Sequence, residues 1–128
     1  MTAHLYLIRG VPGSGKTTLA RVMQKTGMVD AYTEADLFML DSRGCYRFDP
    51  ALLKRCHETC QRHALYALES GLRVAVSNTF TRAWEMQPYI DMGFPFTVLR
   101  CEGAYKNVHG VPETKVQQMR ERFEDWEA

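Results

Sequence analysis

The sequence predicts an α/β fold in which helices cover both faces of a parallel sheet. Short apolar segments with strand character alternate with longer segments of helical character, the expected strands being residues 4–9, 29–33, 72–77 and 96–101. Such alternation favours a parallel sheet, because each crossover places a helix on one face. A glycine-rich turn between the first strand and the first helix indicates the same class. The length of 128 residues indicates one domain, residues 1–128.

Four segments are expected to form helices, namely residues 16–26, 50–70, 81–91 and 112–126. The second has the clearest boundary signals. Asp49 suits its N-cap, Pro50 suits its first turn, and Gly71 follows its last residue. Pro88 is expected to disturb the third helix, since proline lacks the N–H that a helix interior needs.

Composition restricts the class of protein. A hydrophobic fraction of 45% with 24% charged residues is ordinary for a globular domain. The net charge of +1 argues against a large, uniformly basic nucleic-acid surface, although a local basic groove stays compatible with it. Neither an apolar run of membrane-spanning length nor the layout of a signal peptide is seen. We therefore expect a cytoplasmic protein without a membrane partner, and the oligomeric state is left open.

The cysteines allow two interpretations. All four are expected to be free thiols in the cytosol: Cys45, Cys56, Cys60 and Cys101. Cys56, Cys60 and His63 share a helix face, which would suit a metal ion. The spacing fits better with one small apolar stripe that faces the core, formed by Leu53, Cys56, Cys60, Ala64 and Ala67.

The strongest motif is residues 10–17, which match the phosphate-binding loop G-x-x-x-x-G-K-[ST] in its required position between a strand and a helix. Glycines allow the backbone of such a loop to approach a ligand closely, and its N–H groups form an anion-binding nest. The start of the following helix adds positive potential. The residues predicted to bind the nucleotide are Gly10, Val11, Pro12, Gly13, Ser14, Gly15, Lys16, Thr17 and Thr18.

Two side chains of this motif carry specific roles. Lys16 is expected to reach the β- and γ-phosphates, and the Thr17 hydroxyl is expected to bind Mg²⁺. The expected cofactors are therefore ATP and Mg²⁺, and the expected fold is that of a P-loop nucleotide-binding domain.

Polar residues follow the other strands at the same edge of the sheet, where ligands of such sheets bind. Asp36 follows the second strand and is predicted to accept a proton from an attacking hydroxyl or to hold Mg²⁺ through water. Glu34 is the reserve candidate. The alternative is that Asp36 only caps the turn over residues 37–40.

Asn78 and Thr79 follow the third strand. They are predicted either to orient an acceptor hydroxyl or to form hydrogen bonds with the unpaired main-chain groups at the start of the helix that begins near Arg82. After the fourth strand, Lys106 is predicted to neutralise transition-state charge, alone or with Arg82 or Arg100. Lys106 belongs to a loop that could fold over the phosphates as a lid, together with Asn107 and His109.

Asp36 and the segments 77–81 and 107–112 carry a resemblance to a known group. Almost the whole chain resembles the small P-loop kinase-like ATPases of the polynucleotide-kinase and NEDD4-binding-protein-2-like group, including compact phage-type members. The resemblance implies a three-layer α/β/α P-loop NTPase with a short parallel sheet in the order 2-3-1-4. It also implies that Lys16 and Thr17 hold ATP and Mg²⁺ and that Asp36 occupies the position of the kinase base.

Three positions depart from that pattern. Met39 replaces an arginine three residues beyond the base, Ser77 replaces a carboxylate at the end of the third strand, and the lid before Asn107 lacks an arginine-bearing helix. The main prediction is a kinase that transfers the γ-phosphoryl of ATP to a hydroxyl of a nucleotide, a polynucleotide 5′ end or a small molecule. The departures favour the alternative, a regulatory module that binds and hydrolyses ATP without a phosphoryl acceptor and recruits a protein partner.

Overall fold

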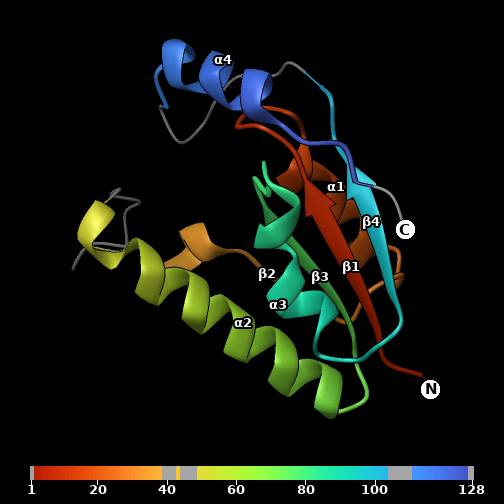
Figure 1. Cartoon of the computed structure of the whole chain (residues 1–128). Coiled ribbons are helices and arrows are strands. Elements are labelled where there is room, and N and C mark those ends of the chain that lie inside the picture. Colours follow the sequence, from red (N-terminus) through yellow and green to blue (C-terminus); the bar gives the residue numbers. More distant parts are fainter. Residues whose placement is uncertain (1, 39–42, 44–48, 104–110, 127–128) are drawn as a thin grey trace.

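The computed structural model describes residues 2–38, 43, 49–103 and 111–126. Within these residues a parallel sheet forms the centre of the molecule, with strands β1 (His4–Arg9), β2 (Ala31–Thr33), β3 (Arg73–Asn78) and β4 (Phe96–Arg100) (Figure 1). The strand order is β2-β3-β1-β4, and every adjacent pair is parallel. The predicted fold class and the order 2-3-1-4 are confirmed.

The helices form the outer layers. Helix α1 (Lys16–Lys25) covers one face of the sheet, and α2 (Leu53–Glu69) with the short α3 (Gln87–Ile90) covers the other (Figure 1). Helix α4 (Glu113–Arg122) lies beyond the carboxyl end of the sheet. Single 3₁₀ turns are η1 (Ala35–Phe38), η2 (Pro50–Leu52) and η3 (Ala83–Glu85).

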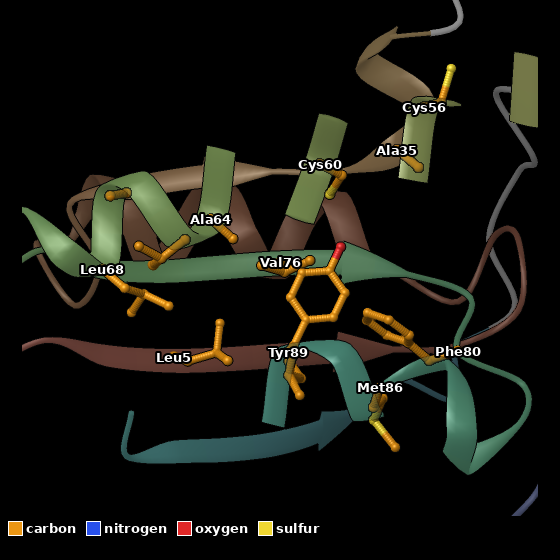
Figure 2. Packing of buried hydrophobic residues seen from close by; sticks show 13 residues of the cluster. Leu5, Ala35, Cys56, Cys60, Ala64, Leu68, Val76, Phe80, Met86 and Tyr89 are labelled. Carbon is orange, nitrogen blue, oxygen red and sulfur yellow. The ribbon is translucent and has the colours of Figure 1, made fainter. Parts of the chain in front are cut away.

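The alternation of strand side chains separates the core into two clusters. Leu5, Leu7, Val74 and Val76 face α2 and α3, whereas Ile8 and Ala75 face Ala20 and Met23 of α1. Figure 2 shows the larger cluster, where small residues of α2 such as Cys60 and Ala64 are fully buried and let the helix approach the sheet. The rings of Phe80 and Tyr89 close this cluster edge to face, with centroids 5.7 Å apart.

The predicted apolar stripe on α2 is correct except at its start. Cys56, Cys60, Ala64 and Ala67 are all buried. The prediction for Leu53 is wrong, because its side chain is 40% exposed. Leu53 is the first residue of α2, whose beginning projects past the sheet, so no strand lies beneath this first turn (Figure 1). Cys45 lies outside the described residues.

Helix boundaries follow the predicted signals with three differences. The segment from Pro50 begins as the 3₁₀ turn η2, and the Asp49 Oδ1 caps it by accepting the Ala51 N–H at 3.0 Å. The predicted helix 81–91 is instead the two pieces η3 and α3, with Pro88 in the first turn of α3, where its missing N–H has no cost. The last helix ends at Arg122 rather than residue 126, because Phe123 adopts an extended conformation.

Candidate active site

The predicted phosphate loop connects β1 to α1 at the carboxyl end of the sheet (Figure 1). It curls back on itself, with the Ser14 N–H donating to the Val11 carbonyl at 3.1 Å. Gly13 and Gly15 have φ values of 83° and 100°, in the left-handed region where a side chain would be strained. The loop therefore depends on glycine at these two positions for its shape.

The first glycine is needed for a different reason. A Cβ at Gly10 would lie 2.3 Å from the Ser14 Oγ and 2.8 Å from the Cys101 carbonyl oxygen. The segments that follow the neighbouring strands are bonded to the loop. The Gly10 N–H donates to the Thr79 carbonyl at 3.2 Å, and the Gly103 N–H donates to the Ser14 carbonyl at 3.0 Å. The loop is thus seated between the segments that follow β3 and β4.

The N-terminus of α1 suits an anion. Among the described residues, no side chain caps this helix and no acidic residue occupies its first turn. The first N–H groups of a helix lack intrahelical partners and carry partial positive charge. A helix start that no described side chain caps is an arrangement that can bind phosphate groups.

Lys16 extends across the mouth of the loop, where its Nζ donates to the Val11 carbonyl at 3.1 Å. Burial lowers the pKa of Lys16, and the charges of Glu34 and Asp36 oppose this effect. Both carboxylates therefore lie close enough to act on the Lys16 ammonium. Lys16, predicted to bind phosphate, is thus within electrostatic range of the two acidic candidates that follow β2.

Glu34, the reserve candidate for the acidic role, is buried. It is only 8% exposed, and its Oε2 accepts a hydrogen bond from the Tyr32 hydroxyl. Burial and the Glu34 carboxylate raise the pKa of Tyr32, so this hydroxyl stays a donor at neutral pH. Tyr32 also interacts with the side chain of Thr17. Tyr32 therefore contacts both Glu34 and Thr17, whose hydroxyl is expected to bind Mg²⁺.

Asp36 lies in the first turn of η1, directly after β2, and is partly exposed. The start of this turn is fixed from β3, since the Asn78 Oδ1 accepts the Ala35 N–H at 2.9 Å. The predicted candidates Lys106, Asn107 and His109 and the departure at Met39 lie outside the described residues.

The remaining predicted cations are engaged elsewhere. Arg82 forms an ion pair with Glu124 at 3.5 Å, and Arg100 pairs with Asp125 at 2.7 Å and with Glu102 at 3.3 Å. The Glu85 carboxylate caps the helical turn after β3, because it accepts the Arg82 N–H at 2.9 Å. Asn78 and Thr79 are therefore not needed for that turn.

Arg9 is a buried residue that the sequence reasoning missed. It is 1% exposed, and its Nε and Nη2 donate to the Phe80 carbonyl at 3.1 and 2.7 Å. Phe80 has a φ of 46°, so Arg9 stabilises a strained backbone next to the loop. The Cζ atoms of Arg9 and Arg100 each lie 4.3 Å from the centroid of the Phe123 ring. The sequence feature that could have indicated this role is an arginine inside an apolar strand, directly before Gly10.

A hollow of about 480 Å³ opens beside the phosphate loop. Its volume falls within the usual range for small-molecule sites. Residues of the loop, of α1 and of the segment after β4 form its wall, namely Ser14, Gly15, Thr18, Leu19, Val22, Cys101 and Gly103.

Within the described part of the chain, none of the helices combines the length and the apolar character needed to cross a bilayer. The same residues contain no group of three or more histidine, cysteine or acidic side chains suited to a metal ion. Cys56 and Cys60 lie in the core, and burial raises the pKa of both thiols. These positions support the interpretation of the cysteines as core residues.

The parallel sheet and the glycine loop before α1 define a P-loop nucleotide-binding domain with the architecture of the P-loop kinases. A family model described as an AAA domain matches residues 5–108, and the chain belongs to this family.

Comparison with known proteins agrees with this class and confirms the resemblance stated from the motifs. The chain is 33% identical to NEDD4-binding protein 2 of Homo sapiens over 134 residues, which include 94% of this chain and 8% of that protein. It is also similar to a chain of the Pnkp1/Rnl/Hen1 RNA repair complex, with a TM-score of 0.74, 16% identity, and coverage of 95% of this chain and 44% of that one. A gluconokinase from Sinorhizobium meliloti gives a TM-score of 0.68 and 15% identity, with coverage of 95% and 75%.

Proposed function

We propose that this domain transfers the γ-phosphoryl group of ATP to a hydroxyl acceptor. The observation that carries the proposal is that Glu34 and Asp36 directly follow β2 at the same edge of the parallel sheet as the loop that ends in Lys16. A lysine within electrostatic range of two carboxylates, next to an anion nest, provides groups for phosphate binding and for proton acceptance. The kinase-like architecture of the similar structures supports the same reaction class.

ATP would bind with its triphosphate in the loop, where the N–H groups of residues 13 and 15–18 and the Lys16 ammonium contact the phosphates. Lys16 would exchange its hydrogen bond to the Val11 carbonyl for phosphate oxygens. The nucleoside would occupy the adjacent hollow of about 480 Å³, against Leu19 and Val22. A wall that combines the apolar Leu19 and Val22 with the polar Ser14 and Thr18 suits a base and a ribose.

The donor set near the loop fits a divalent cation with oxygen ligands. Thr17 offers a hydroxyl, and Asp36 and Glu34 offer carboxylates that already act on the same ammonium. Thr17 and Asp36 would hold Mg²⁺, and Glu34 would hold one of its water ligands. When bound, Mg²⁺ neutralises charge on the phosphate oxygens. Glu34 would thus supply the carboxylate that Ser77 does not provide at the end of β3.

In the transfer step, Asp36 accepts the proton of the acceptor hydroxyl. The acceptor oxygen forms a bond to the γ-phosphorus while the bond to the bridging oxygen breaks, which leaves ADP. Lys16 stabilises the negative charge that shifts to the bridging oxygen. Lys106, outside the described residues, remains the proposed second cation. The acceptor is a nucleotide, a polynucleotide 5′ end or a small molecule, and the similar chain of an RNA repair complex favours the polynucleotide.

A second candidate is a regulatory module that binds and hydrolyses ATP and recruits a protein partner. The observation that favours it is Ser77, whose hydroxyl is buried and has no hydrogen-bond partner among the described residues, where a carboxylate would assist metal binding. This candidate requires the same phosphate loop but no acceptor beside Asp36.

The two candidates are separated by incubating the protein with ATP labelled at its γ-phosphate, with and without an oligonucleotide that carries a 5′-hydroxyl. Nucleosides and gluconate serve as alternative acceptors. The proposed kinase labels an acceptor, and Asp36→Asn lowers this labelling by about 10²–10⁴-fold while the affinity for ATP without Mg²⁺ stays unchanged. Release of labelled phosphate without labelling of any acceptor would support the regulatory module instead.

A further inference from the structure

A small polar cluster lies in the core behind the turn that carries Asp36. It consists of Thr33 at the end of β2, Cys60 in the middle of α2 and Asn78 at the end of β3, which are 5%, 0% and 8% exposed. Figure 2 shows Cys60 at the sheet face with the Tyr89 hydroxyl pointing towards it. Three different elements therefore meet directly beneath η1.

Both ends of the Asn78 amide are used inside this cluster. Its Oδ1 accepts the Ala35 N–H at 2.9 Å, and its Nδ2 lies 3.9 Å from the Cys60 Sγ, within donor range for sulfur. The Thr33 hydroxyl lies 3.8 Å from the same sulfur. The orientation is set by chemistry, because a main-chain N–H must meet an acceptor and only Oδ1 of the amide can accept.

The bond to Ala35 joins residues 43 positions apart and crosses from β3 to the segment after β2. Ala35 is 4% exposed, so its N–H has no access to water at this position. Without the Asn78 Oδ1, a buried donor would lose its partner, and the turn would be driven to move towards solvent. Asp36 is the next residue along this turn and would move with it.

We infer that Asn78 is a positioning residue for Asp36 and that it acts through the Ala35 N–H rather than by touching the acceptor. The inference rests on the proposed role of Asp36 as the proton acceptor. Both polar ends of the amide face protein groups, so neither is directed to a substrate. A displacement of the order of 1 Å at a reacting group is sufficient to lower a rate by about 100-fold.

The test compares two substitutions of Asn78 with a control. Asn78→Leu keeps the approximate volume but removes the acceptor, whereas Asn78→Asp keeps an oxygen that faces Ala35. Thr97→Val is the control, because it removes another inter-strand side-chain bond, from Thr97 Oγ1 to His4 Nε2 at 2.8 Å, near the opposite end of the sheet. For each protein, hydrogen exchange of the Ala35 amide, ATP affinity and labelling of a 5′-hydroxyl oligonucleotide are measured.

In Asn78→Leu we expect faster exchange of the Ala35 amide, unchanged affinity for ATP without Mg²⁺ and about a 100-fold lower kcat. In Asn78→Asp we expect slow exchange and a higher kcat than in Asn78→Leu, and Thr97→Val should match the wild type in all three measurements. The decisive comparison is made in the Asp36→Asn background, where Asn78→Leu should change kcat by less than about threefold, because the group that it positions is already gone.

Equal fold-losses from Asn78→Leu in both backgrounds, or an unchanged Ala35 exchange rate, would overturn the inference while leaving the base assignment intact. A wild-type rate in Asp36→Asn alone would overturn the base assignment and, with it, the catalytic part of this inference. The Ala35 exchange rate would still report whether Asn78 holds the turn. The two failures are therefore distinguishable.

Discussion

The two halves of the candidate site, the phosphate loop and the turn that carries Asp36, are built in different ways. The loop takes its shape from consecutive residues, with Gly13 and Gly15 in left-handed conformations and Gly10 packed against Ser14. The turn at Asp36 takes its position from a side chain of β3, 43 residues away. The shape of the phosphate loop is therefore encoded mainly by consecutive residues, whereas the placement of the proposed base depends on a tertiary hydrogen bond.

The largest effect is expected from Lys16→Ala. Removal of an ammonium that contacts buried phosphate groups costs about 2–5 kcal/mol of binding free energy, so ATP affinity should fall by at least about 30-fold. Isothermal titration with ATP and Mg²⁺ measures the change. Lys25→Ala, on an exposed residue at the other end of α1, is the matched control and should bind ATP like the wild type. Unchanged affinity in a folded Lys16→Ala variant would disprove the role of the loop.

The next effect is expected from Gly10→Ala. The added Cβ meets the Ser14 Oγ and the Cys101 carbonyl, and such overpacking costs about 1–3 kcal/mol of folding free energy. Because Ser14 belongs to the loop, ATP affinity should fall as well. Chemical denaturation and ATP titration report the two quantities separately.

The control for this change is Gly93→Ala. Gly93 has a φ of 84° and open space around it, so the substitution should destabilise through backbone strain alone, by about 1–2 kcal/mol. Its ATP affinity should not change. A Gly10→Ala variant that lost stability but bound ATP normally would show that the loop adapts and would weaken the contrast between the two halves.

Glu34→Gln tests whether the β2 side of the site contributes to metal binding. Loss of a carboxylate that holds a metal ligand typically weakens metal affinity by about 10–100-fold. Titration of the ATP-loaded protein with Mn²⁺, followed by its paramagnetic resonance signal, measures this change. Glu58→Gln on the exposed side of α2 serves as the control. Equal Mn²⁺ affinities in the two variants would remove Glu34 from the proposed metal environment.

The smallest effect is expected far from the site, at the amino end of the sheet. Arg73 donates to both carboxylate oxygens of Asp30 at 3.1 and 3.2 Å, and these bonds lower the pKa of Asp30. A lowered folded-state pKa contributes stability above the unfolded value, about 3.9, and that stability is lost as the pH falls through the folded-state pKa.

Asp30→Asn should therefore be slightly less stable than the wild type at pH 7, and the difference should shrink below about pH 4. Urea unfolding of both proteins across this range measures it. ATP affinity at pH 7 should be equal in the two proteins. A difference in stability that grew as the pH fell would contradict the assigned direction of the pKa shift.

The sequence predicted the parts of the molecule that depend on neighbouring residues. The phosphate loop, the Asp49 cap and the alternation of strands and helices all arise from local patterns, and the structure contains each of them. The Asn78–Ala35 bond could not be predicted, because nothing within a few residues of Asn78 specifies its partner. Glu34 was ranked below Asp36 for the same reason, since its burial beside Tyr32 results from the packing of β2.

The most direct test of the central claim follows the main-chain amide resonances of the folded wild-type protein during titration with ATP and Mg²⁺. We expect saturable shifts that are largest within residues 10–18, because the N–H groups of residues 13 and 15–18 would contact the triphosphate. The absence of shifts in that segment at millimolar ATP, or saturation with the largest shifts elsewhere, would contradict it.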